Sequence, residues 1–284
     1  MDGREQNMGE ISMTKILTIN SHKGGVSKTT IVFESGDYLE QMGERVLLLD
    51  LDTSMSLTYR YTSEAEKDES IKAENTVLNL FQINGWAEPI KVSTNIDLIA
   101  GSAELASKNQ EIIQGMGRRY LISWVARNIE WLEKNYDFVL IDTHNDGSVI
   151  VENAMVASDK IVVPVDVDID SIGKIMELEH HLEEVKALEV LPTTQESYVK
   201  AQTLKIGAKV GDGADDKAFI KAFTQLMDKD ESYLGWIPYS KLIAKAKTQN
   251  KPLSEFKAMP LYQSQNFKDL YSKVEGLFNK IYGI

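Results

Sequence analysis

Residues 21–30 read Ser-His-Lys-Gly-Gly-Val-Ser-Lys-Thr-Thr, with a largely apolar run at 16–19 before them and another at 31–33 after them. The flanking runs predict a strand and a helix, so the glycines lie at the turn between the two. Glycine lets the backbone approach an anion closely, and a helix N-terminus offers unpaired N–H groups and a partial positive charge. Lys28 then provides a charge for the β- and γ-phosphates of a nucleotide, and the hydroxyl of Thr29 a ligand for magnesium. The stretch therefore predicts a phosphate-binding loop.

The loop departs from the strict pattern G-x-x-x-x-G-K-[ST], because His22 and Ser27 occupy its two glycine positions. A glycine-rich turn that binds nothing is the alternative for these ten residues taken alone. Lys23 stands directly before the two glycines, and with it residues 23–30 resemble the deviant Walker A motif of the ParA/MinD ATPases.

The resemblance implies that the chain binds ATP with Mg²⁺ and hydrolyses it. It assigns the following residues to the nucleotide: Gly24, Gly25, Val26, Ser27, Lys28, Thr29 and Thr30. It also implies that Lys23 is catalytic together with Lys28, reaching across a homodimer interface to the nucleotide of the other subunit. The alternative for Lys23 is a solvated lysine beside the loop.

The composition of the chain is compatible with a protein that binds ATP in this way. The chain has 284 residues, 43% of them hydrophobic, which suffices for one large α/β domain or two small ones. It has no cysteine, which excludes disulfides and thiolate metal sites and fits a reducing cytoplasm. No run of eighteen apolar residues occurs, so no membrane span is expected. We expect residues 1–12 to be a disordered leader or tag and residues 13–284 to form one ATPase domain.

Strands and helices are predicted to alternate, as in a P-loop α/β fold whose mostly parallel, twisted sheet has helices on both faces. The predicted strands are 15–20, 45–50, 96–100, 138–141, 161–164, 204–210 and 233–237. The predicted helices are 29–42, 118–134, 148–157, 171–188, 218–227, 241–247 and 263–281. Gly43 is expected to close the first helix in a left-handed conformation. The polar stretch 53–75 is expected to be a surface segment.

Acidic residues follow two of these strands: Asp50 and Asp52 at the end of 45–50, and Asp142 after 138–141. Ligands bind at the carboxyl ends of the strands in such sheets. The resemblance implies that Asp52 orients the attacking water, that Asp50 supports magnesium, and that Asp142 accepts a hydrogen bond from a magnesium-bound water or from Thr29. A turn or helix cap is the alternative for Asp50.

The chain departs from the family pattern beside these residues. Thr53 and Ser54 stand in place of the usual proline and glutamine, and His144 and Asn145 in place of a proline pair. A histidine exposed on a loop is the alternative to a phosphate-sensing role for His144. Farther on, residues 161–165 and 235–253 also resemble the family, which implies that Pro238 lines the adenine pocket.

The net charge is −12, but residues 241–284 carry eight lysines against three acidic residues. A basic region on an acidic body is compatible with binding to DNA phosphates. The candidate DNA-contacting residues are Lys241, Lys245, Lys247, Lys251 and Lys257. An ordinary solvated surface is the alternative.

Taken together, the resemblance implies a ParA-type partition ATPase. Such a protein dimerises on ATP, binds DNA non-specifically, is stimulated by a ParB-like centromere-binding partner, and lies on the nucleoid in the cytoplasm. Two alternatives remain open: a MinD-like membrane-cycling regulator, and a positioning ATPase for a cargo other than DNA. The apolar stripe of 267–281, with lysines beside it, motivates the membrane alternative, although core packing explains the same stripe.

Overall fold

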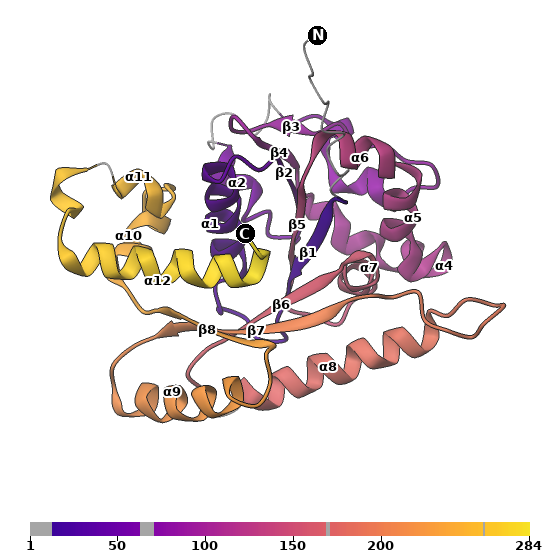
Figure 1. Ribbon diagram of the computed structural model, residues 1–284. Coiled ribbons are helices and arrows are strands. Elements are labelled where there is room, and N and C mark those ends of the chain that lie inside the picture. Colours follow the sequence, from indigo (N-terminus) through magenta and orange to yellow (C-terminus); the bar gives the residue numbers. More distant parts are fainter. Residues whose placement is uncertain (1–12, 63–70, 169–170, 258) are drawn as a thin grey trace, which may run out of the picture.

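The computed structural model describes residues 13–62, 71–168, 171–257 and 259–284, so the expectations for residues 1–12 and for part of the 53–75 stretch lie outside it (Figure 1). Its centre is an eight-stranded sheet of order β3-β4-β2-β5-β1-β6-β7-β8. Within the described residues only β3 runs antiparallel to its neighbour. The strands are β1 (Lys15–Ile19), β2 (Val46–Leu51), β3 (Ile90–Lys91), β4 (Ile96–Ile99), β5 (Phe138–Thr143), β6 (Lys160–Val165), β7 (Gln202–Val210) and β8 (Tyr233–Pro238).

Helices cover both faces of this sheet (Figure 1). One face carries α1 (Lys28–Gln41), α10 (Lys241–Thr248), α11 (Leu253–Lys257) and α12 (Gln265–Tyr282). The other face carries α5 (Tyr120–Arg127), α7 (Val149–Ala157), α8 (Ser171–Leu188) and α9 (Ala214–Met227). Shorter elements are α2 (Thr58–Tyr61), α4 (Asn109–Gln114), α6 (Ile129–Asn135) and the 3₁₀ turns η2 (Ala73–Asn75), η3 (Val77–Phe81), η4 (Ala103–Lys108), η5 (Gly117–Arg119) and η6 (Pro260–Tyr262).

Side chains of the strands contribute to the hydrophobic core on both faces of the sheet. On β1, Leu17 and Ile19 pack with α1 and α12, whereas Ile16 packs with the helices of the other face. This alternation follows from the pleat of a strand. All residues of β2 and β5 are buried, as expected for central parallel strands covered on both sides. The predicted mostly parallel sheet with helices on both faces is therefore confirmed.

Two expectations from the sequence are wrong. The single helix expected over 118–134 is two helices that meet at Asn128, whose φ of −114° and ψ of 17° leave the helical region. The side-chain amide of Asn128 donates to the carbonyl of Trp124 at 2.8 Å, and such a local bond competes with helix continuation. The second wrong expectation concerns residues 53–62, because Thr58 and Arg60 are buried rather than on the surface.

Candidate nucleotide site

Three adjacent central strands of the sheet, β2, β5 and β1, end at the site. β1 lies between β5 and β6, and β2 lies on the far side of β5. The register pairs Ile19 with Asp142, and Asp142 with Asp50. The parallel topology therefore brings the loop after β1 and the acidic ends of β2 and β5 to one edge, as the sequence predicts.

The phosphate-binding loop runs from the end of β1 to the start of α1 at Lys28. Gly25 has a φ of +80°, and Ser27, the residue that precedes the helix, has φ 70° and ψ 25°. Both lie in the left-handed region, which costs a residue with a Cβ about 1–2 kcal/mol. The carbonyl of Ser27 accepts the first helical hydrogen bond from the N–H of Ile31 at 2.9 Å, and Val26 beside it is 1% exposed. The fold itself thus holds Ser27 in this conformation.

Lys28 is buried and 9% exposed at the start of α1. Burial lowers the pKa of its ammonium group, and the carboxylates of Asp142 and Asp52 oppose that effect. The Lys28 ammonium group thus lies at a helix N-terminus near two carboxylates. A phosphate group together with its metal ion would pair with these charges.

Asp142 is completely buried at the end of β5, where the Thr29 hydroxyl is close enough to lower its pKa, but neither carboxylate oxygen has a partner at normal hydrogen-bond geometry. Burial raises its pKa well above the usual value, and the neighbouring carboxylate of Asp50 adds to the effect. The side-chain N–H₂ of Asn20, after β1, is also buried without a partner. Buried polar groups are nearly always hydrogen-bonded, so these orphaned atoms fit a site that water or a hydrated cation completes.

Asp50 has a different environment from Asp142. One oxygen accepts from the N–H of Asp52 at 3.2 Å, and the other accepts from the N–H and the hydroxyl of Thr58 at 2.8 and 2.7 Å. The same hydroxyl accepts from the N–H of Gly101 at 2.8 Å. Burial raises the pKa of Asp50 to about 6. This arrangement favours the capping alternative, in which Asp50 holds the loop that carries Asp52.

Asp52 is half-buried in that loop, where its carboxylate accepts from the N–H of Ser54 at 2.8 Å. It therefore lies at the sheet edge on the side of Lys28, where a carboxylate can act on a water molecule.

Lys23 makes contacts that the sequence did not predict. Its ammonium group lies 2.9 Å from a carboxylate oxygen of Asp166 and 2.7 Å from one of Asp168, in the segment after β6. The hydroxyl of Ser171, the first residue of α8, also donates to Asp166 at 2.7 Å. These hydrogen bonds raise the pKa of Lys23.

A cavity of about 300 Å³ opens beside the first turn of α1. Ser27 and Thr30 line it at the phosphate loop, and Pro238 lines it at the end of β8. Most of its remaining wall is apolar and comes from β7, α10 and α12. Among the wall residues that sequence reasoning did not assign, Glu34 and Lys209 are charged. The ammonium group of Lys209 donates to the carbonyl of Gly25 in the phosphate loop at 2.5 Å.

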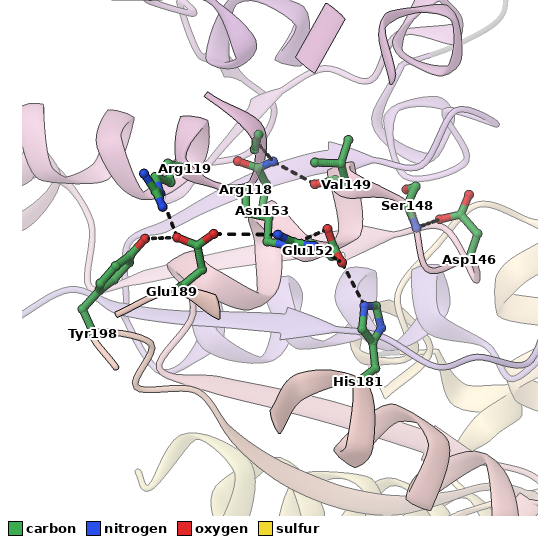
Figure 2. Close-up of polar contacts among 11 residues, drawn as sticks. Arg118, Arg119, Asp146, Ser148, Val149, Glu152, Asn153, His181, Glu189 and Tyr198 are labelled. Carbon is green, nitrogen blue, oxygen red and sulfur yellow. Dashed lines mark hydrogen bonds and ion pairs between the residues drawn. The ribbon is translucent and has the colours of Figure 1, made fainter. Parts of the chain in front are cut away.

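A chain of polar contacts joins the helices behind the loop (Figure 2). His181 of α8 lies 3.0 Å from Glu152 of α7, and Glu152 lies 2.8 Å from Arg118. Glu189, at the end of α8, pairs with Arg119 at 2.8 Å. The ring of His181 is 5.7 Å from that of His22. The contacts fix α8 against α7 and bring α8 up to the phosphate loop.

His144 lies on the loop after β5, where it is half-buried and its Nδ1 is 3.3 Å from a carboxylate oxygen of Asp146. Because the residue is on a loop but half-buried, a phosphate-sensing role for His144 stays a prediction.

The five candidate lysines of residues 241–257 are not equivalent. Lys245 is hydrogen-bonded to the hydroxyl of Tyr262, Lys251 pairs with Glu255 at 2.7 Å, and Lys257 lies over the ring of Tyr271. Lys241 and Lys247, on α10, are exposed. These two are therefore the better candidates for contacts with an external anion.

Comparison with known proteins places the chain in a family. A family model described as an AAA domain matches residues 14–191. The sporulation initiation inhibitor protein Soj of Bacillus subtilis is 32% identical over 155 residues, 54% of this chain and 58% of that protein. A ParA family protein of Mycoplasma pneumoniae is 25% identical over 208 residues, 69% of this chain and 71% of that protein. The chain belongs to the ParA family of P-loop ATPases that these matches define.

The solved structures agree in fold. The structure of a Borrelia burgdorferi plasmid partition protein bound to AMPPNP superposes with a TM-score of 0.74, covering 95% of this chain and 99% of that one at 19% identity.

The sequence match to the Bacillus subtilis protein Soj spans little more than half of that protein's length.

Proposed function

We propose that the chain is a magnesium-dependent partition ATPase, which dimerises on ATP and moves or segregates DNA. The observation that carries the proposal is the convergence of the buried Lys28, the buried carboxylate of Asp142 and the half-buried Asp52 on one sheet edge, beside a phosphate loop. The partition role is supported by the Borrelia plasmid partition protein, which shares the fold.

The residues divide the work in the following way. Lys28 and the N–H groups of residues 24–30 hold the β- and γ-phosphates. Asp52 orients the attacking water towards the γ-phosphate. Thr29 would ligate Mg²⁺, which would supply charge neutralisation at the phosphates, and Asp142 would accept a hydrogen bond from a water of the metal's shell. In the described residues no cluster of three or more acidic or histidine side chains could hold a metal alone, which accords with a cation held largely by nucleotide and water.

Dimerisation on ATP gives Lys23 its role. In a face-to-face homodimer its ammonium group would leave Asp166 and Asp168 and neutralise phosphate charge on the other subunit. Lys23→Gln should therefore bind ATP as a monomer and fail to pair.

Size-exclusion chromatography with a non-hydrolysable ATP analogue and Mg²⁺ measures this. Lys268→Gln is the matched control, because Lys268 is an exposed lysine of α12 that does not line the cavity beside the phosphate loop. A normal analogue-dependent dimer of Lys23→Gln would contradict the proposed role.

DNA binding should depend on ATP and weaken with salt, because phosphate contacts release counterions. Replacing Lys241 and Lys247 by glutamate should lower affinity for all DNA sequences alike, and because Lys247 also lines the cavity beside the phosphate loop, the affinity of this variant for ATP is measured alongside. The same exchange at Lys217 and Lys221, exposed on α9 on the other face of the sheet, should have little effect.

Equal losses from the two pairs of exchanges, or a loss confined to one DNA sequence, would remove the α10 surface from the proposal. A ParB-like partner should raise the ATPase rate of the DNA-bound dimer.

The membrane alternative loses its main support. The apolar stripe of α12, from Phe267 to Ile281, is buried in the core against α1 and β1. No helix of the described residues is long and apolar enough to cross a bilayer. We therefore favour DNA over a lipid surface as the second ligand.

A further inference from the structure

Glu34 is a buried carboxylate without an assigned role. It lies on α1, two turns after the start of that helix, and is 7% exposed. Its Oε2 accepts from the N–H of Leu253 at 2.9 Å, whereas its Oε1 has no hydrogen-bond partner. An unpaired buried oxygen of this kind costs free energy unless something else satisfies it.

Glu34 also lines the cavity that begins at the phosphate loop. Ser27 and Thr30 line the cavity on the first turn of α1, and Glu34 lines it one turn farther on. Two lysines, Lys209 and Lys247, also line the cavity, but they are exposed to solvent. Glu34 is the acidic residue of the lining, and it is buried. A triphosphate held by the loop would direct its base into this space.

The walls suit a planar ring. Ala208, Pro238, Ala244 and Phe278 are among the apolar residues that line it, and the volume of about 300 Å³ admits a purine with part of its ribose. In such a pocket a single polar group fixes which base is accepted, because a base that mismatches it leaves that group unpaired.

We propose that Glu34 is the residue that selects adenine, by accepting a hydrogen bond from the exocyclic amine at position 6 of the base. The inference rests on the proposed function as an ATPase. Oε2 of Glu34 already accepts from the Leu253 N–H, and Oε1 has no partner. Glu34 therefore offers one acceptor to a ligand. Adenine presents a donor at position 6, whereas guanine and hypoxanthine present an acceptor there.

Arg60 offers a competing explanation. Its guanidinium group is buried, has two nitrogens without partners, and attracts Glu34 electrostatically, but the two side chains form no ion pair in the described structure. If Glu34 served only to balance Arg60, its removal would affect every nucleotide alike.

The test exploits the chemistry of Glu34→Gln. The Leu253 N–H still requires an acceptor, so the amide oxygen stays there and the –NH₂ group takes the place of Oε1. A free acceptor thus becomes a free donor. The variant should disfavour adenine and favour a base with oxygen at position 6.

Calorimetry would measure the affinities of ATP, purine riboside triphosphate, which lacks the 6-amine, and inosine triphosphate. At a pH of about 8.5, above the pKa of about 7 that burial gives Glu34, its carboxylate is ionised, and the wild-type protein should bind ATP about tenfold or more tightly than either analogue, as expected for one hydrogen bond to a charged group. Glu34→Gln should lose the preference over purine riboside triphosphate and bind inosine triphosphate at least as well as ATP.

Asp37→Asn is the matched control. Asp37 is also a carboxylate of α1, but its oxygens accept from Ser254 and Gln41 and it does not line the cavity. This variant should keep the wild-type order of nucleotides.

Two results would overturn the inference: equal wild-type affinity for ATP and purine riboside triphosphate, or an equal loss for all three nucleotides in Glu34→Gln. The first needs no variant to fold. Failure of the wild-type protein to bind any of the three would instead overturn the proposed ATPase function, and this inference with it.

Discussion

Ser27→Gly tests whether the phosphate loop carries backbone strain. Ser27 has a φ of +70°, and the Ile31 bond to its carbonyl together with the buried Val26 holds it there. A left-handed residue with a Cβ costs about 1–2 kcal/mol, which glycine avoids. Glycine in turn adds about 0.5–1 kcal/mol of unfolded-chain entropy. The free energy of unfolding should therefore rise by roughly 0.5–1 kcal/mol net.

The same exchange at Ser272 is the matched control, because this residue is exposed within α12. There glycine should lower the free energy of unfolding by about 0.5 kcal/mol, following helix propensity. Urea unfolding at equilibrium measures both variants, and calorimetry measures their affinity for ATP.

Because the fold holds Ser27 in its strained conformation, ATP affinity should stay equal or rise, and hydrolysis should be equal or faster. A destabilised Ser27→Gly protein would refute the strain argument. A clear loss of affinity or turnover would mean that the Ser27 hydroxyl makes a contact of its own.

Three further variants test other parts of the account. Asp52→Ala should bind ATP and dimerise while hydrolysis stops, because the attacking water loses its orienting carboxylate; wild-type turnover would remove Asp52 from the mechanism. Thr58→Val should lower the free energy of unfolding by about 2–4 kcal/mol, since it leaves Asp50 and the Gly101 N–H short of partners in the core; a change below 1 kcal/mol in urea unfolding would contradict this. Burial raises the pKa of Glu34 from 4.5 to about 7, so as pH rises the unfolded state loses this proton before the folded state does. The free energy of unfolding should therefore fall between these two pH values, by up to about 3 kcal/mol from this group. Glu34→Gln should remove that part of the fall between pH 5 and 7.5, and an unchanged slope would show that Glu34 does not titrate as described.

The sequence was sufficient for the features that depend on local pattern and parallel topology. Glycines between a strand and a helix predict the loop, and acidic residues after apolar strands predict the placement of Asp50 and Asp142. Register then pairs them without further information.

Other features were beyond sequence reasoning because they join distant segments. Lys23 meets Asp166 across 143 positions, Lys209 meets the loop across 184, and Leu253 meets Glu34 across 219. No periodicity or motif predicts such pairs. The break at Asn128 is also invisible to an apolar pattern, because a side-chain amide interrupts the helix without changing the spacing of its buried residues.

The central claim is that Lys28 and the loop around it bind the phosphates of ATP. Calorimetry of ATP with Mg²⁺ on the wild-type protein and on Lys28→Ala tests this most directly, with circular dichroism to confirm that both are folded. The account predicts binding by the wild-type protein and no detectable binding by the folded variant, because the phosphates lose their main positive partner. Equal affinity in the two proteins would contradict the account.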